Sequence, residues 1–286
     1  MRVLVRTAWA WWAALCLASI TPAAAASPRV ITLAPSVTEL VFAAGAGADV
    51  VGTDRNSNYP PAVQALPHVG DVMQLDDEAI LALRPTLVIG WQPSPNTSAL
   101  AERLKRLKVP LIYANPQSLE DIPTLIRSLG RRLGTERVAN QEASHLEQQI
   151  RQLHAPRAKV QSVFIEVSAD PLYTLGKDPL INDILRHCGG RNLYADSRIA
   201  APQVSVESVL HLNPDVVIMS PEGHNTLQAR RSWWARYGLP AAKDGHFYAI
   251  ASDWLHRPGP RLVDAAVALC RDLESSREAT TPRVPQ

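Results

Sequence analysis

A short pattern that occurs twice is the feature of this chain that most constrains its fold. Segments 78–89 and 207–218 each begin with a glutamate, continue through three apolar positions to a proline, and end in an apolar run. Each copy predicts a short helix with one apolar face, a proline that ends it, and a buried strand. The duplication predicts two related lobes, and a cleft between lobes is a common ligand site.

The N-terminus has the composition of an export signal. Arg2 and Arg6 precede an apolar run from Ala8 to Ile20, and small residues follow as far as Ala26. This order of charged, apolar and small residues is typical of a cleaved signal peptide, and the run is short for a membrane span. We expect cleavage after Ala26 and export to the periplasm. The alternatives are an uncleaved anchor or, because Cys16 lies in the run, a lipoprotein.

Cleavage at that point would leave two cysteines in the mature chain, Cys188 and Cys270. Exported proteins fold in an oxidising compartment, where a pair of cysteines normally forms a disulfide. We therefore predict a bond between them, the alternative being two buried free thiols. The bond would join two helices of one lobe.

The charge of the mature chain excludes one class of partner. Removal of the signal segment takes away two arginines and leaves 27 basic residues, equal to the 27 acidic ones. Nucleic-acid binding depends on a clustered basic surface, which a balanced chain of this kind does not indicate. We expect no nucleic-acid partner.

Strand and helix patterns alternate over residues 30–113 and again over 160–273, which predicts an α/β fold with sheets covered on both faces. Between them, apolar residues recur at helical spacing over 119–133 and 135–154, which predicts a long helical bridge that limits closure of the lobes. The expected fold is therefore two similar αβα lobes joined by this bridge, with a ligand cleft between them. The expected divisions are a signal peptide (1–26), an N-terminal lobe (27–117), a helical linker (118–155), a C-terminal lobe (156–275) and a flexible tail (276–286).

Several short segments follow one another along the mature chain: 29–36, 38–40, 43–45, Tyr59 to Pro61, Cys188 to Asn192, Asp196 to Arg198, Pro202 to Ser205, and Ser252 to Trp254 with Arg257. Together they resemble the vitamin B12-binding proteins of bacterial ABC importers. That family belongs to the periplasmic binding proteins with a helical backbone between the lobes, which also bind haem, ferric siderophores and metal ions. The resemblance implies capture of cobalamin or a related corrinoid and its delivery to the permease dimer of an inner-membrane ABC importer. It also implies a monomer with no catalytic cofactor.

The resemblance also implies a ligand site in which a flat macrocycle lies between the lobes. Aromatic side chains would stack on its faces and polar groups would meet its edge. The alternatives are a core aromatic for Trp91 and a surface ion pair for Asp253 and Arg257. The implied ligand-binding residues are Tyr59, Trp91, Tyr173, Asp253, Trp254, Leu255, His256 and Arg257.

Three positions that are aromatic in close members of the family are Asn56, Val72 and Ala201 here. Each lost stacking contact is worth on the order of 1 kcal/mol. The replacements predict weaker binding of cobalamin, with Tyr59 supplying part of the lost contact.

The repeated glutamates, Glu78 and Glu207, match the family positions that form salt bridges with arginines of the permease. Two equivalent acids on two lobes suit a two-fold symmetric partner, and they would contribute mainly to orientation. The alternative for each is an acid in the first turn of a helix, stabilised by the helix dipole.

Rival functions remain on the same scaffold. Haem could be held through an axial tyrosine or histidine, with Tyr59, Tyr173 and His256 as candidates. A metal carrier would need converging ligands, but the eight histidines are scattered, so no metal site is predicted. No nucleophile elbow, phosphate loop or zinc-protease motif occurs, and we do not expect an enzyme.

Overall fold

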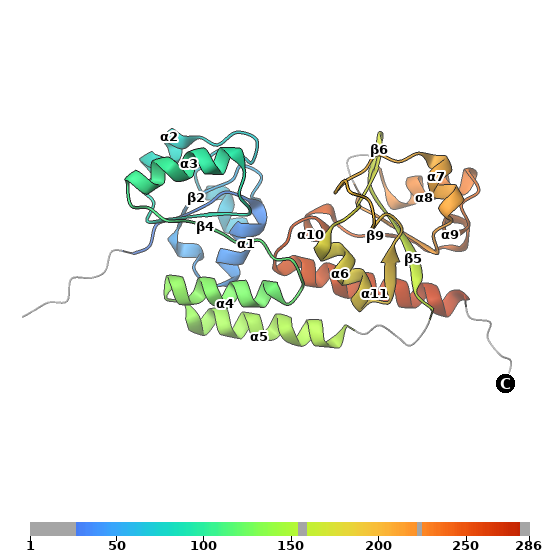
Figure 1. Cartoon of the computed structure of the whole chain (residues 1–286). Coiled ribbons are helices and arrows are strands. Elements are labelled where there is room, and N and C mark those ends of the chain that lie inside the picture. Colours follow the sequence, from blue (N-terminus) through green and yellow to red (C-terminus); the bar gives the residue numbers. More distant parts are fainter. Residues whose placement is uncertain (1–26, 154–158, 222–224, 281–286) are drawn as a thin grey trace, which may run out of the picture.

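The computed structural model describes residues 27–153, 159–221 and 225–280. Two lobes stand side by side on a layer of helices (Figure 1). The expected signal peptide lies outside the described residues. No helix within them is long and apolar enough to cross a membrane.

The N-terminal lobe contains a four-stranded parallel sheet in the order β2-β1-β3-β4. Apolar residues fill these short strands, and most of them are buried. Its elements are β1 (Val30–Thr32), α1 (Pro35–Ala43), β2 (Val50–Thr53), α2 (Asp77–Ala82), β3 (Leu87–Gly90), α3 (Pro95–Arg106) and β4 (Leu111–Tyr113), with 3-10 turns at Gly47–Asp49 and Pro61–Ala65.

The C-terminal lobe repeats this arrangement. Strands β7, β5, β8 and β9 are parallel in that order, and β6 pairs antiparallel with the end of β5. Its elements are β5 (Gln161–Ala169), β6 (Leu172–Thr174), α6 (Pro179–His187), β7 (Gly190–Asn192), α7 (Val206–Leu212), β8 (Val216–Met219), α8 (Leu227–Arg236), α9 (Pro240–Asp244), β9 (Phe247–Ala249), α10 (Ser252–Leu255) and α11 (Pro260–Thr280).

The duplication extends to details of the backbone. In both copies a polar N-cap side chain, Asp76 or Ser205, accepts a backbone N–H three residues on. In both, the residue before the proline has positive φ, 47° at Arg84 and 45° at Asn213. A residue that precedes proline is excluded from the helical region, which explains why α2 and α7 end there. The predicted fold of two related α/β lobes is confirmed.

The helical bridge is a hairpin rather than one rod. Helices α4 (Asp121–Leu133) and α5 (Glu136–Gln152) lie side by side, antiparallel (Figure 1), and Gly134 turns the chain with a φ of 75°. They approach closely at Gly130, where an added Cβ would lie 2.2 Å from the Cβ of Ala139. Residues 121–152 thus fold back on themselves, because the glycine permits a left-handed turn between the two apolar stripes.

A single apolar core joins the two lobes through the bridge. It contains residues of both sheets together with the buried faces of α1, α4, α5, α6 and α11. Each lobe also has a smaller core of its own on the opposite face of its sheet. The lobes are therefore held by packing as well as by chain connection, which supports a largely preformed cleft.

The predicted disulfide between Cys188 and Cys270 is present and joins the end of α6 to α11. A flexible tail is expected at 276–286; residues 276–280 belong to helix α11, and residues 281–286 lie outside the described residues. Helix α11 continues to Thr280, and Arg277 donates hydrogen bonds to the carbonyls of Cys188 and Gly189. These contacts extend the helix beyond the point where the apolar pattern stops.

Candidate ligand-binding cleft

The cleft lies where the carboxyl ends of the two sheets meet. Trp91 directly follows β3, and Asn115 lies just beyond β4. On the other lobe Ser220 directly follows β8, and α10 follows β9. Ligands of open α/β sheets bind beyond the carboxyl ends of the strands, so this edge is the expected binding edge of both lobes.

A cavity of about 520 Å³ occupies this position and is lined by residues of both lobes. Most of its lining is apolar, with a few polar side chains on either side, which is the usual composition of a small-molecule site. The lining residues are Trp91, Gln92, Asn115, Pro116 and Gln117 of the N-terminal part, and Val167, Leu175, Lys177, Asp178, Pro179, Leu180, Ile181, Ala200, Leu255, His256, Pro258 and Leu262 of the C-terminal part.

Three of the expected ligand-binding residues line this cavity: Trp91, Leu255 and His256. Trp91 is 36% exposed, a large fraction for a tryptophan at a strand end. The Nε2 atom of His256 lies 2.8 Å from the hydroxyl oxygen of Ser220, which orients the ring. The apolar face of an indole and an oriented imidazole therefore meet the same space.

Asp253 and Arg257 connect the lobes. Arg257 lies 2.7 Å from the Asp253 carboxylate and donates to the side-chain oxygen of Asn58 at 2.6 Å. The Asn58 amide in turn donates to Asp253 at 2.9 Å. Neither charged residue lines the cavity. Their expected role at the ligand's edge remains a prediction.

Tyr59 faces a different groove. The guanidinium of Arg261 lies 4.4 Å from the centre of its ring, and Arg261 also pairs with the buried Glu39, at 2.6 Å. The hydrogen bond to Glu39 raises the pKa of Arg261 further. These residues line a space of about 720 Å³ beside α1, α5 and the start of α11. As the lobes stand here, Tyr59 lies outside the cavity that contains Trp91.

The two remaining expected aromatic residues lie outside the cavity lining. Tyr173 is half-buried in β6, which pairs with β5. Trp254 is 39% exposed on α10, immediately before Leu255. Their contact with a ligand stays a prediction.

A buried acid lies beyond β2, at the same edge of the sheet as the cleft. Asp54 is 1% exposed, and its carboxylate accepts the backbone N–H of Asn56 at 2.8 Å. Burial raises the pKa of Asp54, although the hydrogen bond from Asn56 and, to a smaller extent, the charge of Arg257 oppose the shift. The folded state thus favours the neutral carboxyl group. The contribution of Asp54 to the free energy of unfolding therefore falls as the pH rises from 3.8 through the raised pKa of this group.

The sequence interpretation missed several polar residues of the cleft: Asn115, Gln117, Lys177 and Asp178. The first two could have been found, because they follow a predicted strand at the edge where ligands bind. The other two lie between β6 and α6, and β6 was not predicted. No local pattern indicates that this connection faces the opposite lobe.

Glu78 and Glu207 are both exposed, in the first turns of α2 and α7. These helices lie at the same end of the two lobes, away from the α4 and α5 hairpin (Figure 1). Each glutamate also lies in the first turn of its helix, so the helix dipole stabilises both carboxylates. The equivalent positions leave two carboxylates accessible to a partner.

Known proteins resemble this chain in sequence and in fold. The vitamin B12-binding protein of Pectobacterium atrosepticum is 32% identical over 260 residues, covering 88% of this chain and 91% of the relative. The crystal structure of the periplasmic vitamin B12 binding protein BtuF of Vibrio cholerae matches with a TM-score of 0.78 and 30% identity, covering 88% of this chain and 98% of that one. The periplasmic haem-binding protein RhuT from Roseiflexus, in its apo form, matches with a TM-score of 0.73 and 28% identity, covering 87% of this chain and 99% of that one. The periplasmic binding protein family model matches residues 30–254, and the chain therefore belongs to that family.

Proposed function

We propose that this protein is a periplasmic carrier that captures cobalamin or a related corrinoid and delivers it to an inner-membrane ABC importer. The observation that carries the proposal is the cavity between the lobes, with Trp91 on one side and Leu255 and His256 on the other. An apolar cleft with a few polar groups suits a macrocycle whose faces are apolar and whose edge is polar. The B12-binding relatives, which align over most of the chain, support the same ligand class.

Haem is the second candidate, and a specific residue favours it. His256 lines the cavity, and imidazole is a common axial ligand of haem iron. Haem-binding proteins are also among the structural neighbours. The hydrogen bond between Ser220 and His256 uses Nε2, so ligation of haem iron would take place through Nδ1 or would replace this bond.

Calorimetric titration of the purified mature protein tests the proposal, with cyanocobalamin, cobinamide and haemin as separate ligands. Saturable one-to-one binding of a corrinoid supports a corrinoid carrier. Binding of haemin without corrinoid binding assigns the cleft to porphyrin instead. Recovery of unchanged ligand after incubation separates a carrier from an enzyme.

Replacing Trp91 by alanine is expected to weaken cobalamin binding on the order of tenfold, because a stacked ring and its buried area are lost. Titration of Trp91→Ala against the unchanged protein measures the effect, and Trp91→Phe should recover part of the affinity. Tyr237→Ala is a matched control, since that aromatic is 53% exposed and lines no part of the cavity. Equal affinities for Trp91→Ala and Tyr237→Ala would remove Trp91 from the ligand site.

The double variant Glu78→Ala with Glu207→Ala is expected to bind cobalamin normally and to lose most transport, because its two docking charges are gone. Cobalamin uptake in vesicles that contain the cognate importer measures transport. The control is Glu102→Ala with Glu278→Ala, which removes two other exposed acids and the same charge. Normal uptake by the first variant would show that these glutamates do not dock.

A further inference from the structure

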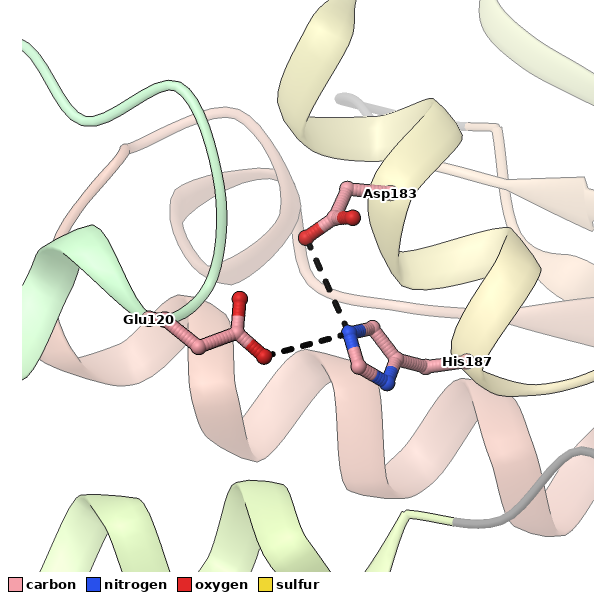
Figure 2. A group of neighbouring side chains, drawn as sticks. All are labelled: Glu120, Asp183 and His187. Carbon is pink, nitrogen blue, oxygen red and sulfur yellow. Dashed lines mark ion pairs between the residues drawn. The ribbon is translucent and has the colours of Figure 1, made fainter.

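Three side chains with metal-ligating atoms converge where the helical bridge meets the C-terminal lobe (Figure 2). Asp183 and His187 are four residues apart on α6 and share one face of the helix, and Glu120 is the N-cap residue of α4. The Nε2 atom of His187 lies 3.4 Å from Glu120 Oε1 and 3.8 Å from Asp183 Oδ2. All three candidate ligand atoms lie within 4.8 Å of one another.

The two separations measured from His187 are close to those around a tetrahedral zinc ion. Zinc bonds of about 2.0 to 2.2 Å to nitrogen and oxygen place neighbouring ligand atoms about 3.3 to 3.6 Å apart. The distance between His187 and Glu120 already falls in this range, and the distance between His187 and Asp183 exceeds it slightly. The Glu120 side chain is 58% exposed, so it can rotate toward an ion at little cost.

The buried member of the cluster is already oriented. Asp183 Oδ2 accepts the backbone N–H of Leu119 at 3.0 Å, and its Oδ1 accepts from Arg186 at 2.6 Å. A carboxylate oxygen has a second lone pair for a metal ion, and bonds of this kind fix the direction of a ligand. Because Leu119 precedes Glu120, the same hydrogen bond holds the ligands of the two elements together.

The cluster opens into a separate space that can hold water as a further ligand. Glu120 and His187 line a cavity of about 360 Å³ with Glu147 and Arg151 of α5. Glu147 is paired with Arg127 and lies 4.0 Å from Arg151, and Asp183 is paired with Arg186. Within the cluster, the negative charge that no arginine offsets therefore comes mainly from Glu120, which faces His187.

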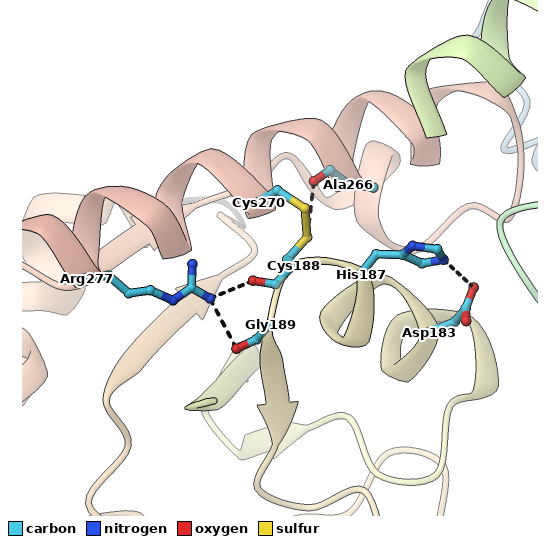
Figure 3. Close-up of a disulfide and its surroundings, with 7 residues drawn as sticks. All are labelled: Asp183, His187, Cys188, Gly189, Ala266, Cys270 and Arg277. Carbon is cyan, nitrogen blue, oxygen red and sulfur yellow. Dashed lines mark hydrogen bonds and ion pairs between the residues drawn. A yellow bond between two sulfur atoms is a disulfide. The ribbon is translucent and has the colours of Figure 1, made fainter. Parts of the chain in front are cut away.

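We propose that Glu120, Asp183 and His187 form a binding site for Zn²⁺. Imidazole with carboxylates is a ligand set that zinc accepts readily, whereas Mg²⁺ and Ca²⁺ prefer oxygen ligands alone. None of the three residues lines the ligand cleft, so the site does not depend on which ligand the cleft takes. An ion here joins the bridge to α6, whose end is fixed to α11 by the disulfide that directly follows His187 (Figure 3).

Titration of the tag-free, EDTA-treated mature protein with ZnCl₂ tests the proposal, in the presence of excess MgCl₂ to occupy unspecific carboxylate sites. The buffer contains no thiol reductant, because reduced Cys188 and Cys270 would themselves bind zinc. We expect one zinc ion per chain in the micromolar range. Glu120→Gln and His187→Gln should each lower the affinity at least about tenfold. His211→Gln is the control, since His211 is an exposed histidine on α7, and it should bind as the unchanged protein does.

Thermal unfolding gives a second readout that does not need a calorimetric signal. Zinc that binds only the folded chain raises the Tm, by roughly 5 to 10 °C at a hundredfold excess over the Kd. The shift should be present in the unchanged protein and in His211→Gln, and largely absent in the two ligand variants. Absence of saturable zinc binding, or equal affinity in all four proteins, would overturn the site.

Discussion

Replacing both Cys188 and Cys270 by alanine is expected to lower the free energy of unfolding by about 4.5 kcal/mol. The disulfide closes a loop with a sequence separation of 82 residues, and the chain-entropy model assigns a cost of this size to its loss. Alanine is preferred to serine because Cys188 is 1% exposed and a buried hydroxyl would add its own penalty. The corresponding fall in Tm is roughly 10 to 15 °C, measured by scanning calorimetry.

Two comparisons separate the loss of the covalent link from other effects of the substitution. Reduction of the unchanged protein should produce a similar fall in Tm, and the alanine variant should no longer respond to reductant. Cobalamin binding at low temperature should survive in the variant, because neither cysteine lines the cleft. A loss below about 1 kcal/mol would mean that packing of α6 on α11 holds the loop without the bond.

Replacing Arg230 by methionine is expected to lower the free energy of unfolding by about 3 to 5 kcal/mol, which is the second large effect. Arg230 donates to both carboxylate oxygens of Glu166, at 2.6 and 3.0 Å, and the two side chains are only 8% and 2% exposed. Removing the guanidinium leaves a buried carboxylate that still accepts from the indole N–H of Trp234, at 2.5 Å. An uncompensated buried charge destabilises far more than a lost surface pair.

The second variant needed is Arg230→Met combined with Glu166→Gln. This pair leaves no buried charge, and glutamine can still accept from Trp234, so the double variant should recover most of the lost stability. Arg103→Met is the surface control, because Arg103 is 52% exposed in its pair with Asp77 and should change stability by less than about 1 kcal/mol. Urea unfolding measures all three. A double variant no more stable than Arg230→Met alone would show that packing, not charge, explains the loss.

Much of the fold could be predicted from the sequence because its signals are local. The repeated pattern beginning at Glu78 and Glu207 indicated two lobes, and the structure repeats it down to the positive φ of Arg84 and Asn213. Short elements without a clear period were not predicted, among them β6, β7 and α8 to α10. Their formation depends on pairing with β5 or on packing against the second sheet. These contacts involve residues distant in the chain, so the local sequence does not indicate them.

The site was less predictable, for a related reason. Trp91 and His256 could be assigned to the cleft by resemblance, and both line the cavity. The hydrogen bonds of Asp253 and Arg257 with Asn58 could not be predicted, because Asn58 lies about 200 residues earlier in the chain. The helical hairpin likewise could not be distinguished from a continuous rod, since the apolar stripes of α4 and α5 are the same in either arrangement.

The sequence by itself determined the α/β class, the duplication and the pairing of the two cysteines that the mature chain would retain. Periodicity, turn residues and residue types carry that information within a few residues of one another. Only the tertiary structure decided that Tyr59 stacks on Arg261 beside the bridge and that Glu120 meets His187. Such contacts join residues far apart in the chain, and they exist because the lobes pack on one shared core with a particular geometry.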